Sequence, residues 1–355
     1  MGDMKKVRQS NLELLRILAM LGVVLLHYNN ESVGGGFAYV AEGSANQYAL
    51  RAVESLFICA VNVFVMLSGY FSVASQKRSA SKAFALLLQV SVFRVGICLL
   101  GVLRSGSFSL GSLLYSLVPV NYYVILYVAL YLVSPYLNIL LNRLDRKQLT
   151  KLLVLTVALF SVYPTAVDVL EAVVGQQIAG LSTIGLEGSQ AGYTIVNFVV
   201  VYLVGAYLRL ADVDVKKRWL VLCLAGCAAA LTLWSCWNTR TAWAYCNPLV
   251  ILEAACLLLL FKKIDLRSKA VNTLAASSFT CFLLHSALLS FFGIGQAVRC
   301  SLPVMLGHMV LTAVVIYLVC WCVYVCYNWC AKPVVRLADR LFERIGRDFS
   351  VEDPM

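Results

Sequence analysis

Long apolar runs alternate with short polar segments along almost the whole chain. Each run approaches the roughly 20 residues that an α-helix needs to cross a bilayer, so we interpret the runs as membrane-spanning helices. The ten predicted spans lie at about residues 11–29, 52–73, 83–103, 121–141, 152–171, 193–210, 219–237, 248–261, 273–293 and 304–329. The pattern therefore predicts an all-α fold, a polytopic membrane helix bundle of about ten transmembrane helices.

The composition agrees with a membrane protein and excludes an ordinary soluble domain. Hydrophobic residues make up 61% of the 355 residues and charged residues only 13%, whereas soluble domains carry about 25% charged residues. The net charge of +11 does not indicate nucleic acid, because the basic residues form short clusters between the apolar runs and not one patch. We therefore expect the lipid bilayer as a partner, and no nucleic acid.

Basic residues are distributed unevenly between the two sides of the predicted bundle. Of the 29 Lys and Arg residues, 23 lie at the N-terminus, in every second connection and in the C-terminal tail, and four lie in the opposite connections. Because cytoplasmic loops are enriched in Lys and Arg, this bias predicts an even number of spans with both termini in the cytoplasm.

Two parts are expected, a membrane domain over residues 1–332 and a cytoplasmic amphipathic tail over residues 333–355. In the tail, Val334, Leu337 and Leu341 fall on one helical face and arginines on the others. Such a helix is typical of one that lies on an anionic inner leaflet.

The thirteen cysteines lie in or near the predicted spans. No His or carboxylate joins them at metal-ligand spacing, so we interpret them as small packing residues and expect no metal site.

The outer connections and their borders carry polar and aromatic residues. Residues 30–51 and 172–192 are rich in Gly, Ser, Asn and Gln. They either shape a mouth for a hydrophilic acceptor or serve as flexible connectors. Tyr122 and Tyr123, at the outer start of the fourth span, are typical of interfacial anchors.

The first span carries charged side chains that hydrocarbon tolerates poorly. Glu13, Arg16 and His27 interrupt an otherwise apolar run. Eleven helical steps separate Arg16 from His27, which places them on one face with about 16 Å between them along the axis. Two costly side chains on one stripe favour a functional role over simple bonding between helices. A helix that lines a polar passage would have this pattern.

Further polar residues lie at membrane depth in other spans: Gln89, Arg94, Glu253, His285 and His308. Each has an ordinary explanation, a hydrogen bond to a neighbouring helix. For Glu253 and His285 this explanation and a functional one stay open. For Gln89 and His308 the ordinary explanation is favoured.

Several segments together resemble the integral membrane acyltransferases called the acyltransferase 3 family. The spacing of Arg, ten residues and His in the first span, here Arg16 and His27, resembles the family signature. Similar segments follow in the expected order: NVFVMLSGYF (62–71), NYYVILYVALYLVSPYLNILL (121–141), NPLVILEAACLLLLFKK (247–263) and SSFTCFLLHSALL (277–289). The resemblance implies transfer of an acyl group, usually acetyl, from cytoplasmic acyl-CoA to a hydroxyl of an envelope polysaccharide or glycolipid. It also implies a multi-pass protein of a bacterial cytoplasmic membrane.

The resemblance implies roles for three catalytic candidates. His27 would remove the proton from the acceptor hydroxyl, because imidazole titrates near neutral pH. A covalent acyl-histidine is the variant of this mechanism. Glu253 or His285 would orient the imidazole or stabilise its cation.

The donor acyl-CoA would be bound by residues near the cytoplasmic side. Arg16, with Arg78 and Lys82, would attract the CoA phosphates, and Arg94 and Ser68 are further candidates for donor binding. Many family members carry a denser arginine motif at the cytoplasmic side of the third span than this chain does.

Other classes of membrane protein fit part of the pattern. A secondary transporter or flippase for a glycan-related solute would also place polar residues at membrane depth. A membrane sensor without turnover is a third alternative. The stripe of Arg16 and His27 favours the acyltransferase.

Overall fold

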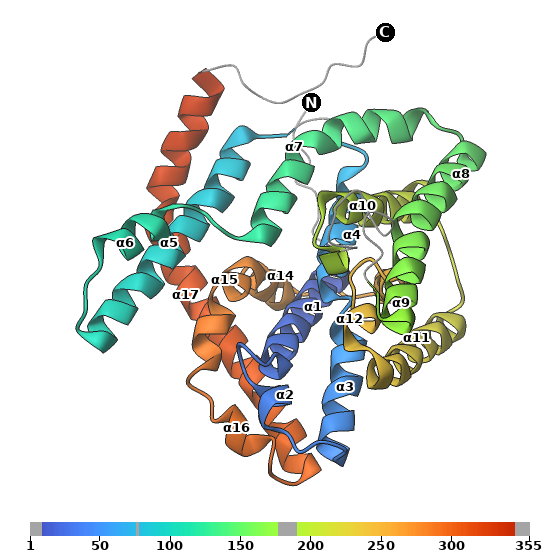
Figure 1. The fold of residues 1–355 in the computed structure, drawn as a ribbon. Coiled ribbons are helices and arrows are strands. Elements are labelled where there is room, and N and C mark those ends of the chain that lie inside the picture. Colours follow the sequence, from blue (N-terminus) through green and yellow to red (C-terminus); the bar gives the residue numbers. More distant parts are fainter. Residues whose placement is uncertain (1–8, 76–77, 177–189, 345–355) are drawn as a thin grey trace.

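The computed structural model describes residues 9–75, 78–176 and 190–344, which contain helices and connecting segments and no strand. The helices are α1 (Ser10–Asn29), α2 (Gly36–Tyr39), α3 (Ala45–Phe57), α4 (Ala60–Ser72), α5 (Ala80–Ser105), α6 (Leu110–Leu117), α7 (Tyr122–Arg143), α8 (Arg146–Val157), the π-helical turn η1 (Ala158–Val162), α9 (Tyr163–Val174), the 3-10 turn η2 (Gln190–Gly192), α10 (Ile195–Leu210), α11 (Lys217–Trp237), α12 (Thr239–Ala242), α13 (Pro248–Lys262), α14 (Lys269–Ala275), α15 (Ser278–Leu289), α16 (Ile294–Ala297) and α17 (Leu302–Arg344). Figure 1 shows their arrangement.

The predicted all-α membrane bundle is confirmed, whereas its count of ten spans stays a prediction. Among the described residues, seven helical segments are long and apolar enough to cross a membrane, and α14 with α15, bent by 54°, would make an eighth. Helices α10 and α13 occupy two other predicted spans with 16 and 15 residues. Both are shorter than the roughly 20 residues of a typical span.

Helix α1 lies at the centre of the molecule, where it contacts α3, α4, α13, α14, α15 and α17. Polar side chains tie both of its ends to neighbours. At the start, Asn11 Nδ2 donates to the carbonyl of Phe261 at 2.9 Å. At the other end, the buried Asn29 donates to Glu54 Oε2 at 2.8 Å. These bonds fix the position of α1 among the helices that surround it.

Helices α4 and α10 pack with their backbones in close approach. A Cβ on Gly69 of α4 would collide with the carbonyl of Tyr202 on α10, and one on Gly205 of α10 would collide with the carbonyl of Met66 on α4. Small residues allow such approach between membrane helices, where van der Waals packing replaces the hydrophobic effect as the main attraction. The two glycines therefore hold one side of the central bundle together.

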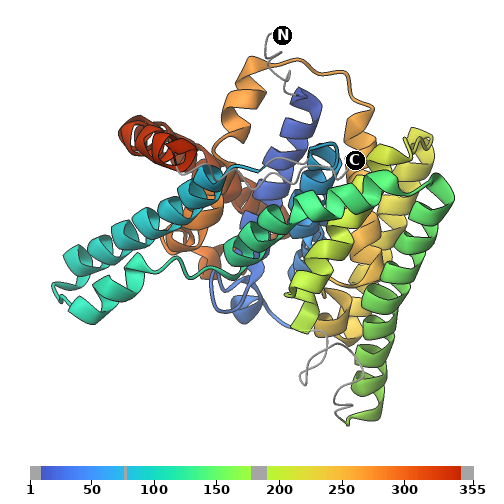
Figure 2. The same cartoon turned by 90° about the horizontal axis from the view of Figure 1, so that it is seen from above.

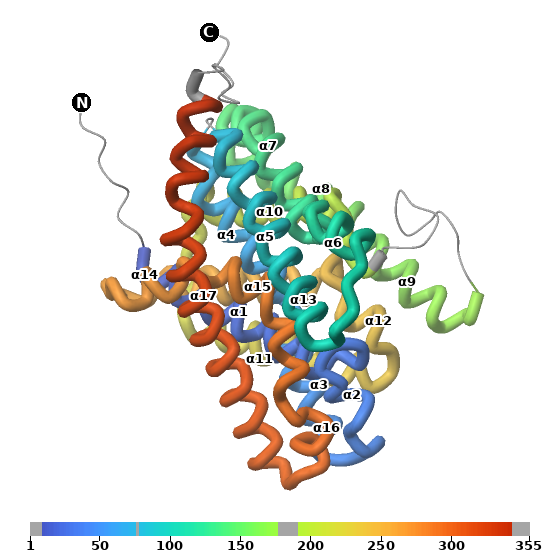
Figure 3. Tube along the Cα trace, turned by 90° about the vertical axis from the view of Figure 1, so that its left-hand side faces the viewer, coloured from blue at the N-terminus to red at the C-terminus, as the bar shows by residue number. Residues whose placement is uncertain are grey.

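Helices α5 and α6 and the C-terminal part of α17 form a flank outside this central bundle, as Figure 2 shows. The N-terminal part of α17 packs into the bundle through Met305, Met309 and Ala313. Two aromatic pairs join α5 to α17: Phe84 with Phe342, at 6.0 Å between ring centroids, and Phe93 with Tyr327, at 5.1 Å. Figure 3 shows the two helices side by side.

Helix α17 continues without interruption through the predicted boundary at residue 333 and ends at residue 344. Residues 345–355 of the predicted tail lie outside the described residues. With 43 residues, α17 is about 65 Å long, about twice the thickness of the hydrocarbon core. A helix of this length is longer than the apolar layer is thick.

Candidate active site

Two histidines from different helices meet at the centre of the protein. His27 comes from the last turn of α1 and His285 from α15, and their ring centroids lie 4.6 Å apart with the planes at 77°. His285 is buried and His27 is partly buried. The fold thus brings together two residues that are 258 positions apart and that the sequence singled out separately.

The hydrogen bonds of the two rings determine which nitrogen carries the proton. His27 Nδ1 lies 3.0 Å from the carbonyl oxygen of Val23, and His285 Nδ1 lies 2.9 Å from that of Cys281. A carbonyl oxygen only accepts, so both Nδ1 atoms must donate and both neutral rings keep a lone pair on Nε2. Ser286 Oγ lies 3.2 Å from His285 Nε2 and can donate to it. Nε2 of His27 has no such partner among the described residues, so it is the available base.

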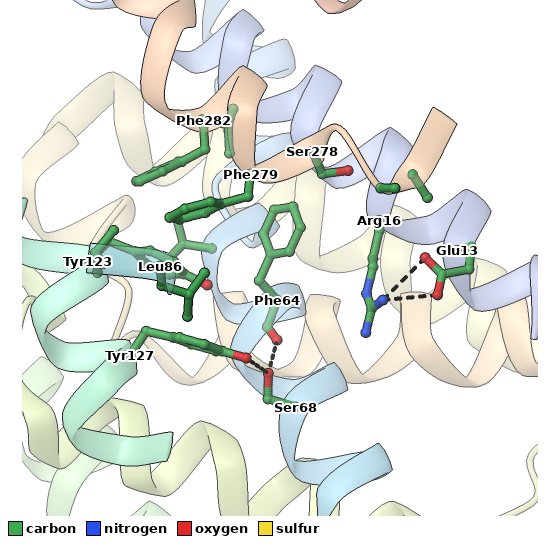
Figure 4. A pocket seen from close by; sticks show the side chains of 15 residues that line it. Glu13, Arg16, Phe64, Ser68, Leu86, Tyr123, Tyr127, Ser278, Phe279 and Phe282 are labelled. Atoms are coloured by element: carbon green, nitrogen blue, oxygen red, sulfur yellow. Dashed lines mark hydrogen bonds and ion pairs between the residues drawn. The ribbon is translucent and has the colours of Figure 1, made fainter. Parts of the chain in front are cut away.

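A cavity of about 310 Å³ lies on one side of the histidine pair. We call it the central cavity, and Figure 4 shows its walls. Its lining residues are Glu13, Arg16, Val23, Val61, Phe64, Ser68, Leu86, Tyr123, Val124, Tyr127, Ala275, Ala276, Ser278, Phe279 and Phe282. Val23 lies one helical turn before His27, and Phe282 packs against His285 with 6.1 Å between ring centroids. The cavity therefore reaches to one turn from the histidines and does not include them.

A second hollow lies on the opposite side of the pair, beyond the end of α1. This outer hollow, of about 350 Å³, is lined by parts of the connections that follow α1 and α15. Gly34, in its wall, donates its N–H to the carbonyl of His27 at 2.9 Å, and Leu289, also in its wall, follows His285 by one turn. Gly35 has a φ of +83°, which glycine adopts without strain, so the connection can fold back over α1. The histidine pair thus lies between two hollows.

Arg16 lines the central cavity as an ion pair. Its Nη1 donates to both carboxylate oxygens of Glu13, at 3.0 and 3.2 Å, and its guanidinium lies over the ring of Phe71. Among the described residues no acceptor bonds its Nη2 or Nε, so these donors remain available to a ligand. The charge is nevertheless compensated, which the sequence stripe of Arg16 and His27 did not reveal.

Ser68 lines the same cavity, where its hydroxyl donates to the carbonyl of Phe64 at 3.0 Å and lies 3.4 Å from the hydroxyl of Tyr127. Tyr123 also lines it and is buried among Phe198, Phe282 and other rings, so the interpretation of Tyr123 as an interfacial anchor was wrong. The sequence signal for these walls was present but weak, because aromatic residues in apolar helices are common.

Glu253 forms no hydrogen bond with the histidines among the described residues. It is fully buried in α13, and neither carboxylate oxygen has a hydrogen-bond partner among the described residues. Cys59, Cys227 and Cys256 are among the residues around it. In the described ranges no ion pair joins Glu253 to either histidine, and no cluster of His, Cys, Asp and Glu could hold a metal ion.

The two other arginines predicted to bind the donor are engaged within the protein. Arg78 is buried, donates through Nε to Ser134 Oγ at 2.9 Å and lies over the ring of Tyr131. Arg94 donates to the carbonyl of Val120 at 3.0 Å and lies over the ring of Tyr115. Neither lines the central cavity.

Lys82 lines a further hollow, of about 470 Å³, between α5, α7 and α17. We call it the basic groove. It shares two wall residues, Leu86 and Tyr127, with the central cavity.

The chain matches the protein family described as Acyltransferase domain over residues 9–327. No curated protein and no solved structure matches it. The matched range runs from the start of α1 into α17 and contains both histidines and all residues of the central cavity. A match of this extent agrees with the motif spacing in the sequence. The chain belongs to the acyltransferase 3 family and is a membrane acyltransferase.

Proposed function

We propose that this protein transfers an acyl group, chiefly acetyl, from cytoplasmic acyl-CoA to a hydroxyl of an envelope polysaccharide or glycolipid, in the cytoplasmic membrane of a bacterium. The observation that carries the proposal is the place of His27 between two hollows. In this proposal the acyl donor approaches His27 from the central cavity and the hydroxyl acceptor from the outer hollow. The walls of these two hollows include Val23 and Gly34, respectively. The orientation predicted from the basic residues, with the start of α1 in the cytoplasm, supports a donor that enters through the central cavity.

The central cavity suits the arm of an acyl-CoA. Its aromatic walls accept an apolar chain, and the donors of Arg16, Ser68 and Tyr127 offer hydrogen bonds to amide and carbonyl oxygens. The rise of about 16 Å between Arg16 and His27 matches an extended arm that carries the thioester toward the imidazole.

The outer hollow suits a carbohydrate. Tyr39 and Phe292 provide aromatic surfaces, and Ser290, Gln296 and Arg299 provide polar groups for hydroxyls. A few placed polar groups within an apolar hollow are the usual basis of ligand orientation.

The chemical step needs one base. His27 Nε2 takes the proton of the acceptor hydroxyl while that oxygen attacks the carbonyl carbon of the thioester. The carbon–sulfur bond then breaks, and the CoA thiolate leaves with the proton that the His27 imidazolium returns. His285 packs against His27 and acts as a positioning residue. Family membership favours this reaction over the transporter or flippase.

The test compares His27→Gln with His308→Gln. Purified protein in lipid nanodiscs is incubated with labelled acetyl-CoA and a panel of envelope glycans, and label transfer is measured. We expect His27→Gln to lose about 100- to 10,000-fold in kcat, the usual contribution of a general base. CoA affinity and melting temperature should stay close to those of the natural protein, because the Gln side chain replaces a partly buried ring.

His308 is a matched control because it is the third histidine and does not line the central cavity. Its ring bonds the hydroxyl of Tyr28 at 2.9 Å. Its substitution should leave most of the transfer activity. Full activity of folded His27→Gln would contradict the assignment of the base. Absence of transfer by the natural protein with every donor and acceptor would contradict the proposed function.

A further inference from the structure

The basic groove combines cations with aromatic rings at one end of the flank. Lys82 comes from the first turn of α5, and Lys332 and Arg336 come from the C-terminal part of α17. Tyr324, Tyr327 and Asn328 line it from the preceding turns of α17. The start of α5 and the end of α17 lie side by side in Figures 1 and 3. Two helices far apart in sequence thus direct positive charge to one hollow.

These three cations, Lys82, Lys332 and Arg336, have no acidic partner in the part of the chain that the structure describes. All three are exposed. In contrast, Arg16 in the central cavity is paired with Glu13. Uncompensated cations around a hollow favour an anionic ligand, and phosphate oxygens are the usual partners of Lys and Arg.

The groove is next to the central cavity. Leu86 and Tyr127 line both hollows, so one molecule that passes these two side chains can occupy both. A ligand of this shape would have an anionic end in the groove and a thin apolar or amide chain in the cavity.

We propose that the basic groove binds the phosphorylated nucleotide end of the acyl donor, with Lys82 on one wall and Lys332 and Arg336 of α17 on the other. This inference rests on the proposed function, since it assigns a place to the donor of that reaction. The adenine ring stacks against the tyrosines of the groove, and the phosphates bond the three cations. The C-terminal part of α17 is then a wall of the donor site as well as a membrane-surface helix.

Two observations favour the nucleotide over a lipid headgroup, which carries similar phosphate chemistry. The groove opens toward the central cavity through shared wall residues, and a lipid would need no such connection. The groove is also walled by α7, a helix that reaches the central cavity through Tyr123 and Tyr127. Lys332 and Arg336 lie beyond the range of the family match, which ends at residue 327.

The experiment measures the Michaelis constant for two donors with Lys332→Gln, Arg336→Gln and the double variant. Acetyl-CoA carries the phosphates, whereas S-acetyl-pantetheine has the same thioester arm and none. We expect KM for acetyl-CoA to rise about fivefold in each single variant and about 20-fold in the double variant, as for loss of partly exposed charge-assisted bonds. The kcat/KM for S-acetyl-pantetheine should not change.

Arg340→Gln is the matched control. Arg340 lies on the same part of α17 and is exposed, but it does not line the groove. If only the general positive charge of this helix attracted the donor, Arg340→Gln would raise KM as much as Arg336→Gln. That result would overturn the proposal. All variants are exposed substitutions, and their melting temperatures verify folding.

A second arm separates the nucleotide from lipid. The assays are repeated in nanodiscs of neutral phosphatidylcholine and of a mixture with anionic phosphatidylglycerol. The proposal expects the same rise in KM in both. A rise that appears only with the anionic lipid would assign the groove to lipid headgroups and overturn the proposal.

The outcomes also distinguish this proposal from the proposed function. A natural protein that consumes acetyl-CoA in a His27-dependent way, together with unchanged KM in Lys332→Gln and Arg336→Gln, contradicts the groove alone. A natural protein that consumes neither donor contradicts the proposed function. Direct binding of adenosine 3′,5′-bisphosphate that weakens in the double variant would still support a nucleotide site in that case, and unchanged binding would overturn it.

Discussion

Helices α1 and α5 are both long and apolar enough to cross a membrane, yet the protein surrounds them differently. In the most apolar part of α1, 61% of residues are buried inside the protein, compared with 11% for α5. The cation of α1, Arg16, is paired with Glu13, whereas Lys82 at the start of α5 has no acidic partner in the described ranges. The charged side chain of the central helix is therefore paired within the protein. The flank presents a cation without an acidic partner in the described ranges, which is available to an anionic ligand.

The largest expected contrast is between a glycine of the central bundle, Gly69 on α4, and a glycine of the flank, Gly96 on α5. Gly69→Ala should destabilise the folded protein by about 2 kcal/mol or more, because its new methyl group meets the Tyr202 carbonyl and neither backbone can yield without moving α4 from α10. Gly96→Ala on α5 should cost almost nothing, since no atom lies within 4 Å of its added Cβ. Thermal unfolding in nanodiscs measures both. Equal destabilisation by the two substitutions would contradict the difference in packing.

The next effect concerns the second histidine of the centre. His285→Ala removes the ring that packs against His27, and we expect kcat to fall by about 10- to 100-fold with KM for acetyl-CoA unchanged, because the base is then misplaced. His285→Asn should restore part of the activity, since its amide can donate to the carbonyl of Cys281 as the imidazole does.

The pH profile of kcat separates positioning from catalysis. With His285→Asn the profile should still follow a single base, since His27 keeps its free Nε2. If the fall of kcat at low pH, which reports protonation of the base, disappears in this variant, His285 is the base and His27 the positioning residue.

Substitutions of the two members of the central-cavity ion pair, Glu13 and Arg16, should change KM for acetyl-CoA in opposite directions and by smaller factors. Glu13→Gln releases Arg16 from its acidic partner, so KM for acetyl-CoA should fall by about threefold. Arg16→Gln leaves a buried carboxylate near the donor, so KM should rise by about tenfold and the melting temperature should fall.

The double variant should have an intermediate KM and regain most of the stability. Initial-rate kinetics and thermal unfolding of the three variants measure this. A rise in KM with Glu13→Gln would mean that the pair acts as one unit and that the cation alone does not bind the donor.

The smallest effect is the response to salt. Exposed charges are screened at distances beyond about 10 Å at 0.1 M ionic strength, whereas buried pairs are screened much less. KM for acetyl-CoA should therefore rise about threefold between 0.05 and 0.5 M salt through the groove. This rise should be smaller in the double variant of Lys332 and Arg336 than in the natural protein, and the same in Glu13→Gln as in the natural protein. Equal salt dependence in the natural protein and both variants would contradict the attraction of the donor by exposed charges of the flank.

The sequence predicted the helical bundle because a bilayer imposes a length and an apolar composition on each span. It also predicted that Arg16 and His27 share one side of α1, since both lie on a stripe of one regular helix. The central cavity runs along α1 from Arg16 to Val23, in the direction of His27, but it ends one turn before His27. Val23 and Phe282 mark that end, and side-chain packing of this kind is not coded in helical spacing.

Contacts between helices were the part that the sequence could not provide. The approach of His285 to His27 depends on the bend between α14 and α15, where two short helices meet at 54°. The pairing of Arg78 with Ser134 depends on how α7 lies against the end of α4. The sequence likewise gave equal standing to Glu253 and His285, and only the fold separates them, because α13 directs Glu253 toward cysteines.

The most direct test is a structure of the protein in nanodiscs with S-ethyl-CoA, a thioether that cannot transfer its acyl-like group. The account predicts the nucleotide in the basic groove, the arm past Leu86 and Tyr127 through the central cavity, and the sulfur next to His27 Nε2. A thioether bound on the lipid-facing surface, or ending far from His27 with the central cavity empty, would contradict it.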